Sequence, residues 1–145
     1  GRAYVPERAA GEQKGPHEAA ACYGFGDDEI EVRLFLTAAG CEICARVLRN
    51  TSGATYEFAL LTALKPGDGV RTATGNQKVE PKQLLQATAG FEWRGLRWEL
   101  PVGAALEYPL VPHNSYTQDG LPVPEDYVGR ISFTVGAEPK RIVIR

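Results

Sequence analysis

Several kinds of residue are scarce in this sequence, and each scarcity argues against a class of protein. Methionine is absent. The only histidines are His17 and His113, so few side chains can act as a general base near neutral pH. The 16 Lys and Arg are balanced by 18 Asp and Glu and mixed with them, whereas nucleic-acid binders carry a basic stripe. No apolar run approaches the roughly 20 residues that cross a bilayer. We therefore expect no nucleic-acid partner and no transmembrane segment.

The length indicates one folded core. A chain of 145 residues is typical of one domain, and its apolar content of 43% is ordinary for such a core. The first residues carry Gly, Pro and charge without a hydrophobic period. We expect an irregular N-terminal arm over residues 1–18 and a single domain over residues 19–145.

Alternation of apolar and polar residues predicts a mostly β protein. Residues 29–36 alternate cleanly, and the alternation resumes over 41–49 after a turn that ends at Gly40, which predicts a hairpin. A third antiparallel strand is expected to follow directly at 55–64, and Val70–Val79 is expected to be a loop or an edge strand. Further strands are expected in a hairpin over 91–100 that bends at Gly95, on an edge at 104–110, and at 127–135 and 141–145.

The strand spacing is typical of an antiparallel two-sheet sandwich, Ig-like or of a related Greek key. One short helix is expected near 81–89. Pro81 suits a first helical position, Leu84, Leu85 and Thr88 recur at helical spacing, and Gly90 would end the helix.

The three cysteines are Cys22, Cys41 and Cys44, and the last two form a lone Cys-x-x-Cys. A zinc site needs four ligands, and a redox motif belongs at the start of a helix, whereas this pair lies on a predicted strand and faces opposite sides. We favour buried apolar fillers, and a disulfide from Cys22 to Cys41 or Cys44 is the alternative. No metal is expected at these thiols.

Two acidic clusters raise the question of calcium. The clusters are Asp27, Asp28, Glu29 and Glu31, and Asp119, Glu125 and Asp126. Calcium needs six or more oxygen ligands with a suitable turn, and neither cluster supplies that pattern. We therefore expect solvated acidic edges and no cofactor, with a peripheral calcium site as the alternative.

Two features of the sequence are candidates for catalysis and for sugar binding. His113 stands two residues before Ser115, but a nucleophile and its base also need positioning and a third, orienting group, so no enzyme is predicted. Trp93 and Trp98 would form a carbohydrate-binding platform if their rings were exposed. Because Glu92, Arg94, Arg97 and Glu99 fall on the opposite faces, a core position is favoured for both rings.

The remaining hypothesis is a non-enzymatic domain that binds another protein. A Pro-rich loop over 109–126 is long, and its prolines lower the entropy cost of ordering it against a target. By analogy with inhibitors and immunity proteins, we expect it to block a partner enzyme. The expected partner-binding residues are His113, Asn114, Tyr116, Gln118, Asp119 and Leu121. The alternatives are a carbohydrate-binding module using Trp93 and Trp98 and a structural or accessory domain of a larger assembly.

The chain opens on Gly-Arg-Ala without methionine, which indicates a processed N-terminus. Together with the all-β character, this pattern favours a periplasmic or secreted domain whose leader has been removed.

Overall fold

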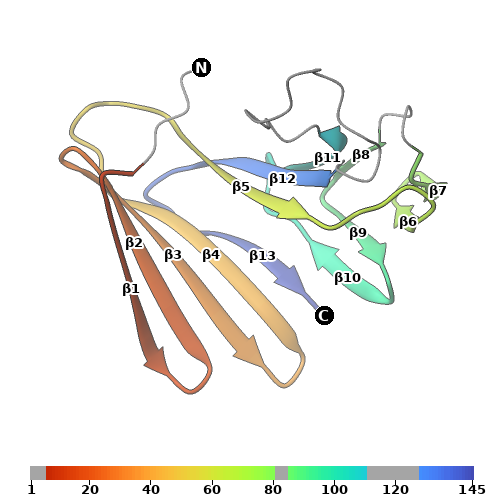
Figure 1. Ribbon diagram of the computed structural model, residues 1–145, viewed down its shortest axis with the longest axis horizontal. Helices are drawn as coiled ribbons and strands as arrows, with labels where there is room; N and C mark the ends of the chain where they lie inside the picture. The colour runs from red at the N-terminus through yellow and green to blue at the C-terminus, as the bar shows by residue number, and fades with distance from the viewer. Residues whose placement is uncertain (1–5, 81–84, 111–127) are drawn as a thin grey trace, which may run out of the picture. The chain divides into compact units, whose positions relative to one another are not determined.

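The computed structural model describes residues 6–80, 85–110 and 128–145 (Figure 1). These residues form thirteen β-strands and no helix, so the all-β prediction is confirmed. The chain divides into two compact units. The first contains Gly1–Phe58 and Thr134–Arg145, and the second contains Ala59–Phe133.

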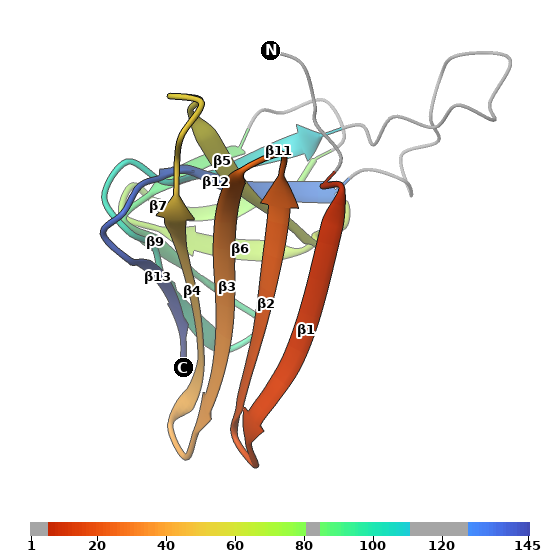
Figure 2. The same ribbon diagram turned by 90° about the vertical axis from the view of Figure 1, so that its left-hand side faces the viewer.

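The first unit is built on two long hairpins and a C-terminal strand. Figure 2 shows the hairpins side by side, with β1 outermost. The strand order is β1-β2-β3-β4-β13, and the paired strands are antiparallel. The bounds are β1 Arg8–Gly15, β2 Glu18–Phe25, β3 Asp28–Thr37, β4 Gly40–Arg49 and β13 Lys140–Ile144.

The predicted hairpin over 29–36 and 41–49 is confirmed as β3 and β4. Val32 lies opposite Ala45 and Leu34 lies opposite Ile43, so the apolar residues of both strands share one face. Gly40 makes the turn possible with a φ of 147°. A Cβ at Gly40 would collide with the backbone of Ile144, which passes directly beside it.

The predicted irregular arm over residues 1–18 is wrong where the structure describes it. Arg8–Gly15 forms β1, which pairs along its length with β2. The side chains of β1 are nearly all exposed, so this strand has no buried face and shows no apolar alternation in the sequence. Main-chain pairing with β2 orders the segment instead.

The second unit contains two further sets of strands, in the orders β10-β9-β6-β7 and β5-β12-β11-β8. Strands β5 and β12 include residues of both units. The bounds are β5 Tyr56–Thr62, β6 Gly69–Thr72, β7 Gly75–Lys78, β8 Leu85–Thr88, β9 Gly90–Trp93, β10 Leu96–Glu99, β11 Ala105–Leu110 and β12 Val128–Val135. The most deeply buried apolar side chains here are Leu64, Val70, Val79, Leu106, Tyr108 and Ile131.

The hairpin predicted over 91–100 is confirmed as β9 and β10. Arg94 and Gly95 both adopt positive φ, 52° and 77°, as a two-residue type I′ turn requires. Phe91 lies opposite Trp98, and Trp93 lies opposite Leu96. The predicted bend at Gly95 is therefore the turn itself.

The predicted helix near 81–89 is wrong over its described part. Leu85–Thr88 forms β8, which pairs antiparallel with β11 and places Ala87 opposite Leu106. Ala89 then takes a φ of 66° and ends the strand. Pairing with β11 satisfies the main chain of this segment, so helical spacing over so few residues was a poor guide. Residues 81–84 lie outside the described residues.

Two strand placements differ from expectation, and a third is partly as expected. The strand predicted at 55–64 is β5, but it neighbours β12 and does not add to β4 as a third strand. The strand predicted on an edge at 104–110 is β11, which lies between β12 and β8. The loop or edge strand expected over Val70–Val79 is the hairpin of β6 and β7, and β7 stands at the end of its strand order. The sequence located β5 and β11, whereas their neighbours depend on contacts distant in the chain.

Replacing Gly40 with Ala should lower the free energy of unfolding by about 1–3 kcal/mol, because the new Cβ meets the backbone of Ile144 and the φ is unfavourable. Urea unfolding measures this value. Gly136→Ala is the control, since its backbone needs no positive φ and nothing lies within 4 Å of the added carbon. Equal effects of the two substitutions would contradict the tight turn.

Candidate functional site

The two faces of the first unit's sheet differ sharply in chemistry. We call one the uncharged face, because apart from the buried Asp28 at the start of β3, alternation and pairing place no charged side chain of β1 to β4 on it. Paired positions and alternation assign its residues. They are Ala9, Gly11 and Gln13 on β1, Ala19, Ala21 and Tyr23 on β2, Ile30, Val32, Leu34 and Leu36 on β3, and Cys41, Ile43, Ala45 and Val47 on β4.

The uncharged face is buried at one end and open at the other. Ile30 and Ala45 are buried, together with Ile142 on β13, whereas Leu34 and Leu36 are 38% and 51% exposed. The two exposed leucines lie toward the turns of the hairpins, where Leu36 N–H donates to the carbonyl of His17 at 2.8 Å. This open end is a place where an apolar surface can be received.

The opposite face, which we call the charged face, carries a chain of ion pairs. Glu31 is 7% exposed and accepts hydrogen bonds from Arg33 at 3.0 Å and Arg46 at 2.8 Å. Arg33 also lies 3.6 Å from Glu18, and Arg141 lies 3.7 Å from Glu42. These pairs join β2, β3 and β4 and connect β4 to β13. Arg33 Nε is the exception on this face, since it is buried without a hydrogen-bond partner.

The pKa values of Glu31 and of the nearby Cys22 thiol both differ from their ordinary values. Burial by itself would raise the pKa of Glu31, but the hydrogen bonds from Arg33 and Arg46 outweigh it and lower that pKa. Burial raises the pKa of the Cys22 thiol, and the nearby carboxylates of Glu29 and Glu31 raise it further. Cys22 is therefore held as a thiol rather than a reactive thiolate.

All three cysteines are free thiols. Cys22 on β2 and Cys44 on β4 share the charged face, but β3 separates them by two strand spacings, roughly 10 Å. Cys41 lies on the uncharged face, as its spacing from Cys44 predicted. The disulfide considered as the alternative is not formed, because this register brings no two of these thiols within bonding distance.

A buried carboxylate anchors the turn after β4. Asp28 is 1% exposed and accepts hydrogen bonds from the backbone N–H groups of Thr51 and Ser52, from both of their hydroxyls and from Tyr56. The Ser52 hydroxyl has the largest effect, followed by Tyr56, and together these donors hold the pKa of Asp28 well below its usual range. Phe25 packs against Tyr56 at 5.4 Å between ring centroids.

The acidic cluster around Asp28 is therefore occupied by the protein's own donors. Asp28 binds the turn, Glu31 binds two arginines, and Glu29 lies 3.5 Å from Arg49. Among the described residues, no group of three or more His, Cys, Asp and Glu side chains gathers in a way that could hold a metal ion. Asp119, Glu125 and Asp126 lie outside those residues.

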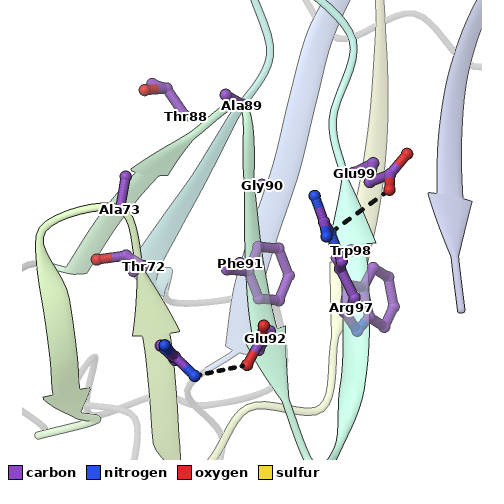
Figure 3. A pocket seen from close by; sticks show the side chains of 11 residues that line it. Thr72, Ala73, Thr88, Ala89, Gly90, Phe91, Glu92, Arg97, Trp98 and Glu99 are labelled. Atoms are coloured by element: carbon purple, nitrogen blue, oxygen red, sulfur yellow. Dashed lines mark ion pairs between the residues drawn. The ribbon is translucent and has the colours of Figure 1, made fainter.

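The second unit carries a shallow hollow of about 350 Å³ (Figure 3). Phe91 and Trp98 are among its lining residues, and their ring centroids lie 5.4 Å apart. Two ion pairs border it, Arg71 with Glu92 at 3.6 Å and Arg97 with Glu99 at 3.4 Å. Both arginines thus have a carboxylate neighbour, which leaves neither as a dedicated anion anchor.

The two tryptophans do not form an exposed platform. Trp98 is 9% exposed, and its Nε1 is buried without a hydrogen-bond partner. Trp93 is half-buried, donates its Nε1–H to Asp68 at 3.0 Å and is covered by the guanidinium of Arg94 at 4.9 Å from the ring centroid. The rings pack on the face opposite Glu92 and Arg97, as the alternation predicted.

The residues expected to bind a partner cannot be placed. His113, Asn114, Tyr116, Gln118, Asp119 and Leu121 all lie outside the described residues, as does Ser115. His17 lies in the turn between β1 and β2, where it is exposed. The exposed Leu34 and Leu36 were assigned to a half-buried strand face, and no signal in that alternation marks which end stays open.

No known protein family, curated protein or solved structure matches this chain. In the described ranges there is also no helix long and apolar enough to cross a membrane.

Replacing Asp28 with Asn should lower the melting temperature at neutral pH, because an amide cannot accept every hydrogen bond that the carboxylate accepts. The pKa of Asp28 is lower in the folded than in the unfolded chain, so its stabilisation is present above about pH 4 and is lost as the pH falls below that value. The difference in melting temperature between wild type and variant should therefore shrink from about pH 5 to about pH 2.

Calorimetry across this pH range measures that difference. The control is Asp27→Asn at the exposed neighbouring position, which should shift the melting temperature by no more than about 2 °C. A difference for Asp28→Asn that stays constant as the pH falls would contradict an ionised, buried Asp28.

Single-tryptophan variants should report two distinct environments. With Trp93→Phe, the remaining Trp98 should emit at short wavelength and resist quenching by acrylamide, because its ring is buried. With Trp98→Phe, the half-buried Trp93 should be quenched more strongly. Equal quenching of both, at the rate of free tryptophan, would instead indicate the exposed platform that a sugar-binding module needs.

Proposed function

We propose that this chain is a non-enzymatic protein-binding domain, and that its uncharged face receives an apolar surface of another protein. The observation that carries the proposal is the exposure of Leu34 and Leu36, 38% and 51%, on a face whose one charged side chain on β1 to β4, Asp28, is buried at the other end of β3. On the charged face of the same strands, the carboxylates of Glu18 and Glu31 are already paired with arginines. Apolar side chains of a partner would thus gain burial without leaving a charge unpaired.

Neighbouring residues shape the surface that the partner meets. Ala19 and Ala21 on β2 are small, the larger Leu34 on β3 lies opposite Ala19, and Ile43 on β4 lies on the far side of Leu34. The side chains of this face are therefore shorter on β2 than on β3. Partner side chains of Leu, Ile, Val or Phe would pack over β2 and contact the side of Leu34. A charged partner side chain would lose hydration here and find no exposed counter-ion on the uncharged face.

Three more detailed predictions from the sequence stay predictions. A two-sheet sandwich with Ig-like or Greek-key connectivity remains a prediction, as does a periplasmic or secreted location. The inhibitor or immunity role through the loop at 109–126 also remains a prediction, because that loop is mostly outside the described residues.

The proposal is tested by selecting random displayed peptides on immobilised protein. Selected peptides should be rich in Leu, Ile, Val and Phe and poor in charge. Leu36→Lys should weaken their binding at least about tenfold, since it places a charge where an apolar contact forms.

Leu61→Lys is the matched control. Leu61 is 56% exposed and lies in the second unit, so the same substitution there should leave binding unchanged. The proposal fails if no apolar sequences are enriched, or if the two lysine variants lose binding equally.

A further inference from the structure

Strand β1 leaves one side of the first unit's sheet open. It stands at the end of the strand order, and seven of its eight residues are exposed. Among the described residues, no strand pairs with its outer side. Its outward main-chain N–H and C=O groups can therefore form a ladder with a strand of another molecule.

The charged residues of β1 favour pairing with a strand that carries the opposite charges at matching positions. Arg8 and Glu12 are four residues apart and lie on the charged face. Arg8 donates to the carbonyl of Gly26 at 2.8 Å, which holds its guanidinium on that face. Glu12 lies 2.7 Å from Lys14.

We infer that β1 pairs antiparallel with β1 of a second copy, with Ala10 opposite Ala10. A two-fold axis perpendicular to the sheet places the charged faces of both copies on one side and the uncharged faces on the other. Each residue of β1 is therefore opposite a residue of the second copy whose side chain lies on the same face. In this register Arg8 lies opposite Glu12 of the second copy, and the symmetry repeats the pair. Cross-strand pairs of opposite charge stabilise such a ladder.

In the neighbouring registers, the charged side chains of the two β1 strands are matched less favourably. Centring the pairing on Gly11 sets Arg8 opposite Lys14 twice, and centring it on Glu12 sets that carboxylate opposite itself. Centring on Ala9 leaves Arg8 opposite Ala10, without an ion pair. The Ala10 register also brings Pro6 opposite Lys14, and because proline has no N–H, the ladder ends there.

Pairing of this kind would join two sheets edge to edge. The uncharged faces of both copies would lie on the same side and form one continuous surface. This inference goes beyond the proposed function and does not depend on it, because Leu36 lies on β3, away from the pairing edge.

The test is sedimentation equilibrium over a range of concentrations. Wild type should show a reversible monomer–dimer equilibrium. Arg8→Glu and Glu12→Arg should each raise its Kd at least about tenfold, because two pairs of opposite charge become two pairs of like charge. The double variant Arg8→Glu/Glu12→Arg should return the Kd close to that of wild type.

The double variant also separates pairing from misfolding, since it restores the charge match while both native side chains are absent. Arg71→Glu, which removes an exposed arginine of an ion pair in the second unit, should leave the Kd unchanged. A wild type that stays monomeric overturns the inference. So does a dimer that ignores the single charge changes, or one that the double variant does not restore.

Discussion

The antiparallel register of β2, β3 and β4 is the constraint on which the first unit depends. It places Glu31 beside Arg46 on the next strand and Arg33 on its own, while it lines up Val32 with Ala45 on the other face. A slip of one residue would turn both sets over, burying arginines and exposing aliphatic side chains. The ion pairs and the apolar face thus specify the same register, and the two-sided chemistry of the sheet follows from it.

The regions that sequence reasoning identified correctly are those where burial acts on one face of a strand. In β3, β4, β9 and β10, apolar and polar residues alternate because one side of each strand is packed, so this alternation located the strands in the sequence. Alternation does not mark β1, whose side chains are almost all exposed, and a helix-like spacing misled at Leu85–Thr88, where the chain pairs with β11. Main-chain pairing orders both segments, with the adjacent strand β2 for β1 and with the more distant β11 for Leu85–Thr88.

The site depends still more on distant pairs. Asp28 was assigned to a solvated acidic edge, yet its donors are Thr51, Ser52 and Tyr56, which lie 23 to 28 residues along the chain. Only the fold shows that this carboxylate is structural. Likewise, alternation located Leu34 and Leu36 on one face, but the exposure of that end depends on what surrounds it in three dimensions.

The central claim is that the uncharged face is open at the end that carries Leu34 and Leu36. Methyl NMR with a soluble paramagnetic agent tests it directly, on dilute protein. The account predicts strong relaxation enhancement for the methyl groups of Leu34 and Leu36, and weak enhancement for the buried Ile30 and Ile142. Equal protection of all four side chains would show that the face is covered and would contradict the proposed binding surface.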